Sequence, residues 1–434
     1  MDNELAAPRE TQEEAKRAVE RTARESYGRL LAFLVARTGD VAGAEDALGD
    51  AFLKALETWP QNGVPDRPEA WILTAARRRQ VDAFRHAAAA AGATMALIEE
   101  ADRVLSSAME PLAGPYFADQ RLKLLFLCTD PAIDPAVRTP LMLQTALGID
   151  AETIANAFLI APATMGQRLT RAKARIRQRK IQIDAPAEAE LPDRINDVLQ
   201  AIYAAFGLGW DRSVYGADCR WRGLRDEAIW LGRLTVSLLP HDPAAKGLLA
   251  LMLYCESRVQ GRRSNGGEYV PLSEQDASLW SIPMIVEAEG LLKSAFRPGR
   301  FGRFQIEAAI QSAHSRRAFG EPVDWCAVAE LYAALVRLSP SVGALVGRAA
   351  AVAESSSPAD GLRLLQQIDA TATAAYQPYW ALRAHLLSDL GFDDDANTAY
   401  QRAIGLSEDP AVRDFLRNRA PRDCRVDATS HIYS

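Results

Sequence analysis

The sequence predicts an all-α protein in which two small helical domains precede a helical-repeat domain. Apolar residues recur at helical spacing along most of the chain, and the clearest stripe consists of Met165, Leu169, Ala172 and Ile176. Short polar or proline-containing stretches separate the predicted helices. The content of 48% hydrophobic and 24% charged residues is that of an ordinary globular chain, and 434 residues suffice for two or three domains.

Composition also excludes several kinds of site. The five Cys and the five His are scattered without metal-ligand spacing, so we expect free thiols in a reducing cytosol and no bound metal. The N-terminal segment is charged, and no apolar run approaches the about 18 residues of a membrane span, so we expect a cytoplasmic protein. No nucleotide-binding loop, nucleophile set or carboxylate pair stands out. The sequence therefore predicts neither an enzyme nor a cofactor.

The first predicted domain spans residues 12–86 and consists of three helices. They are expected at 12–37, 42–59 and 69–86. On the second helix the apolar side chains, Leu56 among them, are expected to face inward. The opposite side then carries charged residues at helical spacing, chiefly Asp46, Asp50 and Lys54. A row of this kind is most often a solvated face.

The third helix of this domain is both basic and aromatic. Asp66 and Glu69 predict a capping box at its start. Farther along, Trp71 and Phe84 accompany a group of polar and basic residues, Arg77, Arg78, Gln80 and Arg85. Single-stranded DNA needs both kinds of group, because unstacked bases stack on aromatic rings and the backbone attracts cations. The alternative is that the two aromatic residues belong to the core.

The second predicted domain spans residues 119–180 and ends in a helix-turn-helix. Two apolar helices are expected first, at 119–128 and 135–147. A short helix after Asp150 and a longer one starting near Pro162 then share a small core. The proline suits the first turn of a new helix, since its fixed φ is helical and its missing N–H would have had no partner.

The last helix of this domain is strongly basic in a chain whose formal net charge is −6. Seven Lys or Arg residues and no acidic residue lie between Ala163 and Lys180. In a helix-turn-helix the early residues of the second helix enter the major groove and its basic end contacts phosphates. The candidate DNA contacts are therefore Thr164, Gln167, Arg168, Arg171, Lys173 and Arg175. The alternative is a solvated basic face.

The C-terminal part follows a predicted linker at 181–192, and its organisation is repetitive. Small or apolar residues spaced by four and three, followed by a proline, occur as Ala228, Gly232, Thr235 and Pro240 and again as Val328, Tyr332, Leu335 and Pro340. A third match begins at Ala396, which lies two 34-residue tetratricopeptide periods after the second. We therefore expect a helical-repeat domain at 193–420 and a tail at 421–434. Its concave surface suits a protein or peptide partner.

Three motifs, in this order, resemble those of a known family. They are AEDALGDAFLKALETW at 44–59, PEAWILTAARRRQVDAFRH at 68–86 and QRLTRAKARIR at 167–177. With them the chain resembles the extracytoplasmic-function sigma factors of bacterial RNA polymerase, within the sigma-70 family. The resemblance covers about residues 27–180, and the C-terminal part looks like the long extension of one branch. Gly49 departs from the pattern, since family members commonly carry Gln there.

The resemblance implies a role for each motif. The first domain would be sigma region 2, in which Asp46, Asp50 and Lys54 bind core RNA polymerase. The −10 element would lie along Trp71, Arg77, Arg78, Gln80 and Arg85. The second domain would be sigma region 4, which reads the −35 element, and the linker at 87–118 would join the two. Strand opening then needs no cofactor, because capture of an extruded base offsets the cost of unstacking it.

The sequence thus predicts a promoter-specificity subunit that initiates transcription and is regulated by its own C-terminal domain. Its expected partners are core RNA polymerase, promoter DNA and a protein or peptide bound by that domain. The alternative is a stand-alone helix-turn-helix transcription regulator with a tetratricopeptide-like sensor domain. Such a regulator would need neither the polymerase-binding helix nor the strand-melting motif.

Overall fold

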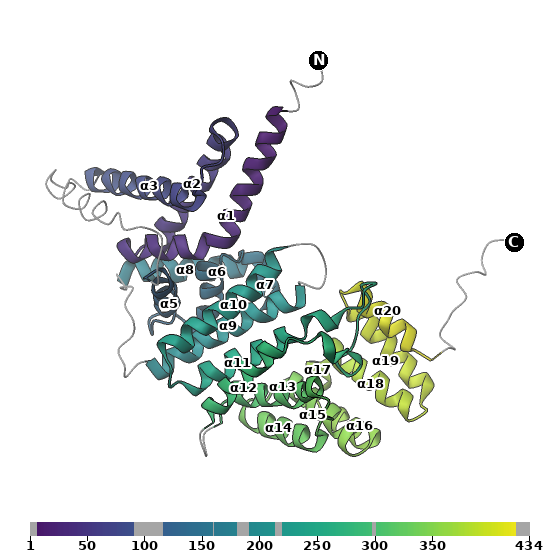
Figure 1. The fold of residues 1–434 in the computed structure, drawn as a ribbon. Coiled ribbons are helices and arrows are strands. Elements are labelled where there is room, and N and C mark those ends of the chain that lie inside the picture. Colours follow the sequence, from purple (N-terminus) through teal and green to yellow (C-terminus); the bar gives the residue numbers. More distant parts are fainter. Residues whose placement is uncertain are drawn as a thin grey trace. The chain divides into compact units, whose positions relative to one another are not determined.

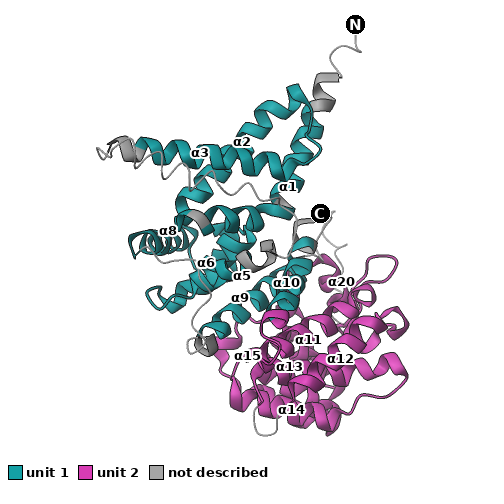
Figure 2. Cartoon of the chain, turned by 60° about the vertical axis from the view of Figure 1, so that its left-hand side comes forward, with its two compact units in different colours: residues 1–235 teal, residues 236–434 magenta. Residues whose placement is uncertain are grey.

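The structure, a computed structural model, describes residues 7–90, 116–158, 160–179, 191–212, 219–296 and 301–421. Every regular element in these ranges is a helix, apart from one isolated β-bridge between Arg263 and Tyr269, so the predicted all-α class is confirmed. The chain divides into two compact units, residues 1–235 and 236–434, which we describe separately (Figure 2). None of the described helices combines the length and the apolarity that crossing a membrane requires.

The first unit opens with three helices at the positions predicted for the first domain. They are α1 (Ala7–Thr38), α2 (Val41–Asn62) and α3 (Pro68–Ala90) (Figure 1). The side chain of Asp40 caps α2 by accepting a hydrogen bond from the N–H of Gly43. The predicted capping box of α3 is wrong, because the Glu69 carboxylate instead accepts hydrogen bonds from Ser26 and Arg29 of α1.

Four further helices occupy the range predicted for the second domain. They are α5 (Tyr116–Cys128), α6 (Pro135–Leu147), α7 (Ala151–Ala157) and α8 (Pro162–Arg179). Met165, Leu169, Ala172 and Ile176 of α8 are all buried, as their spacing predicts. Asp150 caps α7 by accepting a hydrogen bond from the N–H of Thr153. The predicted linkers at 87–118 and 181–192 lie for the most part outside the described residues, as does the tail.

The two predicted domains share a core, because α1 packs against α5 and α6 as well as against α2 and α3. One close approach is at Gly28, where an added Cβ would lie 1.8 Å from the carbonyl oxygen of Ala146. Nearby, the Tyr27 ring lies against Gly148, which ends α6 in the left-handed conformation with φ +65°. Backbone contact of this kind excludes any side chain at residue 28.

The first unit also contains α9 (Leu191–Arg212) and most of α10 (Cys219–Leu238). Helix α9 packs against α5 and α6. There Arg138 pairs with Asp197 at 2.7 Å, and Arg194 donates to the Thr129 hydroxyl at 2.9 Å. The compact units therefore divide between residues 235 and 236, whereas the predicted repeat domain begins at 193. The reason is that the apolar face of α9 is buried against the helices that precede it.

The second unit is a series of helices that pack on their neighbours in sequence. Its α-helices are α11 (Pro243–Ser257), α12 (Ile282–Ala295), α13 (Arg303–Ser315), α14 (Trp325–Leu338), α15 (Val342–Ser355), α16 (Pro358–Gln366), α17 (Ala370–Thr373), α18 (Gln377–Asp389), α19 (Asp393–Leu406) and α20 (Pro410–Arg419). Four 3₁₀ helices are η1 (Val259–Arg262), η2 (Leu272–Glu274), η3 (Ala277–Leu279) and η4 (Arg316–Phe319). Helices α14 and α15 form one antiparallel pair, and α18 and α19 form another. Residues at predicted repeat positions are buried in both pairs, namely Val328, Leu335, Ala396 and Ala403.

Candidate nucleic-acid interface

The outward face of α2 carries the three predicted polymerase contacts. Asp46 and Lys54 are exposed, and Asp50 is half-buried. Between and beyond them lie Leu53, which is 62% exposed, and Leu56, which is 42% exposed. The prediction that Leu56 faces inward is wrong, because Ala55 takes the buried position and a rotation of about 100° per residue turns the next side chain outward. The face therefore combines charges with apolar side chains.

One of these residues is linked to the basic helix. The Arg79 guanidinium lies 2.6 Å from the Asp50 carboxylate, and their side chains are 58% and 46% exposed. An exposed ion pair of this kind contributes about 0–1 kcal/mol, so a partner can replace it at small cost. The sequence did not single out Arg79, because nothing local distinguishes it from its neighbours Arg77 and Arg78.

The predicted −10 residues of α3 divide into an inner and an outer group. Trp71 is half-buried and lies edge-on to the buried Trp59, with ring centroids 5.6 Å apart. The Arg77 guanidinium lies over the ring of Phe33 of α1, 4.4 Å from its centroid. Gln80 is half-buried. These side chains contribute to packing as well as to any surface that DNA would contact.

The outer group consists of Arg78 and Arg85, which are both exposed. They are seven residues apart, so they lie two turns apart on one side of α3. Arg85 also lies 3.8 Å from Asp82 one turn before it, with both side chains about half exposed. Phe84 is 44% exposed, so it is not a core residue.

The predicted −35 residues lie on α8, which follows α7 after a short turn. Five of them are exposed on the side of the helix opposite the buried stripe: Thr164, Gln167, Arg168, Arg171 and Arg175. They form one polar row along the helix, with its basic members toward the C-terminal end. Two short-range features position this row. Asp150 caps α7, and the N–H of Met165 bonds to the carbonyl of Ala161 as α8 begins.

The sixth predicted residue, Lys173, is placed differently. Its ammonium lies 2.5 Å from the Glu45 carboxylate of α2, and the Lys and Glu side chains are only 12% and 18% exposed. Burial raises the pKa of the Glu45 carboxyl, and the Lys173 charge lowers it only in part. The two residues are 128 positions apart in the chain, so no local sequence signal could pair them. In this arrangement Lys173 is not available to a DNA phosphate.

A second contact between α8 and the start of α2 lies one turn farther along. The Arg177 guanidinium is 3.9 Å from the Asp40 carboxylate, and Arg177 is 62% exposed. Asp40 is also the residue that caps α2. Within the described residues, no group of three or more His, Cys, Asp or Glu side chains could hold a metal ion.

Comparison with known proteins identifies two parts of the chain. Sigma-70 region 2 matches residues 23–90, which run from within α1 to the end of α3. A family of unknown function, DUF6596, matches residues 194–296, from α9 to the end of α12. An uncharacterized protein of Rhizobium meliloti (strain 1021) is 36% identical over 375 residues, which cover 86% of this chain and 88% of that protein. The chain belongs to the same family as that protein.

The match to sigma-70 region 2 indicates a function for the first three helices. This match supports the interpretation of the chain as a sigma factor of the sigma-70 family that acts in transcription initiation. It also implies binding to core RNA polymerase and promoter DNA. No solved structure matches the chain. Helices α2 and α3, which carry the predicted polymerase and −10 residues, both lie inside the matched range.

Proposed function

We propose that the chain is an extracytoplasmic-function sigma factor, which binds core RNA polymerase, recognises the −35 and −10 promoter elements and promotes DNA melting. The observation that carries the proposal is the sigma-70 region 2 domain at residues 23–90. The surfaces of α2, α3 and α8 support it, because each displays the side chains that one of these tasks needs.

The polymerase-binding surface is the outward face of α2. Asp46 and Lys54 supply exposed charges, and Leu53 and Leu56 supply exposed apolar area beside them. A solvated helix face needs no leucines, whereas a protein interface combines an apolar centre with a polar rim. When the ion pair between Asp50 and Arg79 opens, the Asp50 carboxylate becomes part of this surface. The Arg79 guanidinium is then a further cation for DNA on α3.

The −10 strand lies along α3, where we assign different tasks to the inner and outer groups. Arg78 and Arg85 are exposed and attract the strand backbone. Trp71 and Gln80, which are half-buried on the same helix, offer the strand an aromatic face and an amide at two separate points along it. Arg77 is a positioning residue, because its cation lies over Phe33 and fastens α3 to α1.

The −35 element is read by α8 as the second helix of a helix-turn-helix. Thr164, Gln167 and Arg168 begin the exposed row and reach base edges, and Arg171 can bond a guanine with two hydrogen bonds. Arg175 and Lys173 contact phosphates. Lys173 must leave Glu45 first, so the described arrangement is a form of the protein that has yet to bind its promoter.

The experiment that tests the function is transcription of a promoter library by core RNA polymerase with and without the protein. We expect new transcripts from promoters that share one −35 and one −10 sequence. A matched variant carries Asp46→Lys and Lys54→Glu, which keeps the net charge and leaves α3 and α8 intact. This variant should still bind the −35 duplex and should lose polymerase binding. Sequence-specific DNA binding without polymerase binding by the wild-type chain would instead identify a stand-alone transcription regulator with a tetratricopeptide-like sensor domain.

We further propose that the second unit regulates the sigma part from within the same chain. It is a helical array, and arrays of this kind present surfaces that bind protein or peptide segments. A unit tethered in the same chain acts at about millimolar effective concentration, so even a weak contact would be closed for most of the time. Promoter-directed transcription by a shortened chain gives the sign of the effect.

A further inference from the structure

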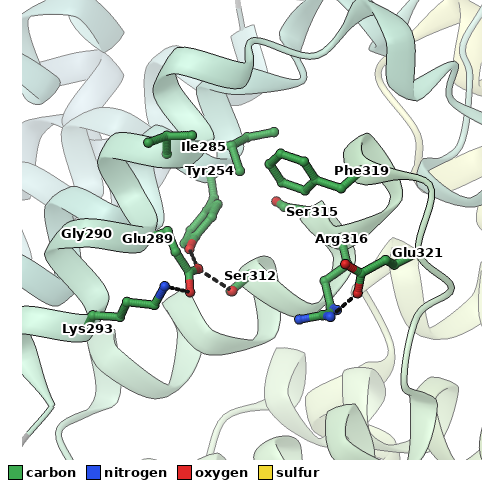
Figure 3. A pocket seen from close by; sticks show the side chains of 11 residues that line it. Tyr254, Ile285, Glu289, Gly290, Lys293, Ser312, Ser315, Arg316, Phe319 and Glu321 are labelled. Atoms are coloured by element: carbon green, nitrogen blue, oxygen red, sulfur yellow. Dashed lines mark hydrogen bonds and ion pairs between the residues drawn. The ribbon is translucent and has the colours of Figure 1, made fainter.

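The second unit contains an open cavity of about 470 Å³ between α11, α12, α13 and η4 (Figure 3). This size is in the range of pockets that hold small organic ligands, about 300–1,000 Å³. Its polar groups come from separate helices, chiefly Tyr254, Glu289, Ser312 and Arg316. None of these residues belongs to the surfaces assigned above to polymerase or DNA.

The carboxylate of Glu289 makes several polar contacts in the cavity. One of its oxygens, Oε2, accepts hydrogen bonds from the Tyr254 hydroxyl at 2.6 Å and from the Ser312 hydroxyl at 3.0 Å. Burial by itself raises the pKa of Glu289, but these donors and Lys293 outweigh it, so the pKa lies below its usual value. The Glu289 side chain remains 40% exposed, and Tyr254 behind it is fully buried. The cavity thus presents a fixed negative charge on a rigid support.

The other carboxylate oxygen of Glu289 is held only weakly. Its neighbour is the Lys293 ammonium, 3.4 Å from Oε1, on a side chain that is 75% exposed. A pair between such exposed groups contributes little, because water and ions screen it. On the opposite wall, Arg316 and Glu321 pair with each other and cancel in charge. A cation that enters the cavity can therefore displace Lys293 and bind Glu289.

Apolar side chains line the rest of the cavity. Val286 is 57% exposed and Phe319 is 54% exposed, although both lie in a unit with a well-buried core. Ile285, which is buried, also lines the cavity. Phe319 points toward the interior of the cavity from the side opposite Glu289 (Figure 3). An apolar body that covers these side chains would remove them from water, which favours binding.

We propose that this cavity binds a small organic cation, in which a primary ammonium or guanidinium group is carried on an apolar body. The cation replaces Lys293 at Glu289, and the apolar body covers Val286 and Phe319. The geometry separates these two parts of the ligand, since the carboxylate lies on α12 and the aromatic ring on η4. The proposal does not depend on the sigma-factor function, because binding is a property of the second unit.

The test compares three probes of nearly equal shape on the full chain by isothermal titration calorimetry: 2-phenylethylamine, 2-phenylethanol and 3-phenylpropanoate. We expect the amine to bind and the alcohol to bind at least about tenfold more weakly, since only the amine brings a positive charge to the carboxylate and both partners of its hydrogen bond are then ionised. The acid should show no binding. Equal binding of the amine and the alcohol, or no binding of the amine at about 10 mM, overturns the proposal.

Four variants locate the binding at this cavity. Glu289→Gln should weaken the amine about tenfold, and Lys293→Ala should strengthen it because it removes the competing cation. Gly290→Leu should abolish it, since a Cβ at Gly290 meets nothing within 4 Å and leucine is a good helix former that fills the space. Glu287→Gln removes the same charge from the same helix outside the cavity lining and should change nothing. Circular dichroism and thermal unfolding verify that each variant is folded, and unchanged binding in folded Glu289→Gln and Gly290→Leu contradicts the assignment.

Discussion

Lys173 of α8 donates a hydrogen bond to Glu45 of α2 across 2.5 Å, and both side chains are largely buried. A helix proposed to contact DNA thus makes an ion pair with the helix proposed to bind polymerase. Removing one partner of a buried ion pair strongly destabilises the folded protein, because the other charge is left buried without compensation. The contact therefore competes directly with any phosphate that Lys173 would bind.

The first prediction concerns this contact. Glu45→Gln should increase the affinity of the free protein for a −35 duplex by about 5- to 30-fold, equivalent to about 1–2 kcal/mol, because Lys173 is no longer held by a carboxylate. Fluorescence anisotropy with a labelled duplex measures the change. Glu57→Gln is the control, since it alters an exposed glutamate of the same helix. An unchanged affinity in Glu45→Gln would show that DNA and Glu45 do not compete for Lys173.

The second prediction separates base contacts from phosphate contacts on α8. Arg171→Ala should cost about 1–3 kcal/mol on the cognate −35 site and little on random DNA. Arg177→Ala should weaken both alike and lower the log–log salt slope by about 0.9. Titrations at several salt concentrations give both quantities. Equal loss of sequence preference in the two variants would refute the assignment of α8.

The third prediction concerns strand opening along α3. The double variant Arg78→Ala, Arg85→Ala should bind duplex promoter together with polymerase and leave the −10 thymines unreactive to permanganate. Arg77→Ala should behave differently and lower the unfolding temperature, because it removes the cation from the Phe33 ring. Arg17→Ala is the control, since it removes an arginine of α1 that is 73% exposed and lies outside the surfaces assigned to DNA and polymerase. Normal melting by the double variant would show that Arg78 and Arg85 belong to a solvated face and take no part in strand opening.

The fourth prediction concerns where the chain can be shortened. A chain of residues 1–192 should be less stable than one of residues 1–241, because it lacks α9 and α10 and exposes the faces of α5 and α6 against which α9 packs. It also loses the ion pairs that Arg121 forms with Glu227 and that Arg138 forms with Asp197. Thermal unfolding compares the two fragments. Higher transcription by the 1–241 chain than by the full chain would mean that the second unit masks the sigma part, and lower transcription would mean that the second unit is required. Equal activity on all promoters would exclude regulation by the second unit.

The fifth prediction uses His314 of α13. Burial lowers its pKa to about 4, and the nearby Arg258 and Arg317 add to the effect. The unfolded chain, where His titrates near its ordinary pKa of about 6.5, therefore binds more protons between pH 6.5 and 4, and stability falls as the pH falls through this range. The decrease approaches about 1.4 kcal/mol per pH unit. Urea unfolding from pH 7 to 4.5 should show this decrease in the wild type, and His314→Asn should reduce it. Identical slopes would mean that His314 binds protons equally in the folded and unfolded chains, which contradicts the prediction.

Local features of the sequence predicted much of the first unit. The stripe at Met165, Leu169, Ala172 and Ile176 requires only helical periodicity, and the structure buries all four residues. Helix ends were less predictable, since α2 continues through Pro60 to Asn62, whereas the sequence suggested a loop there. A proline lacks one hydrogen bond of the helix, but packing of the preceding turns can outweigh this loss.

Contacts between distant residues could not be predicted. Whether Glu69 caps its own helix or bonds to α1 depends on where α1 lies, and its sequence pattern is the same in both cases. Lys173 and Arg175 are both basic residues of α8, but only Lys173 lies opposite a carboxylate of α2. The cavity in the second unit likewise requires Tyr254, Glu289 and Ser312 to converge from three helices. These features arise from tertiary packing rather than from a local pattern.

The close approach of Gly28 to Ala146 has a consequence for cooperativity. Residues 12–86 and 119–180 meet where the backbone of Gly28 contacts that of Ala146, so closely that a Cβ at residue 28 would lie 1.8 Å from the Ala146 carbonyl oxygen. The two parts should therefore unfold in a single transition rather than as two independent modules. Gly28→Ala would then act as a wedge that uncouples them. Its unfolding curve should show two transitions in place of one, each reporting the intrinsic stability of one half.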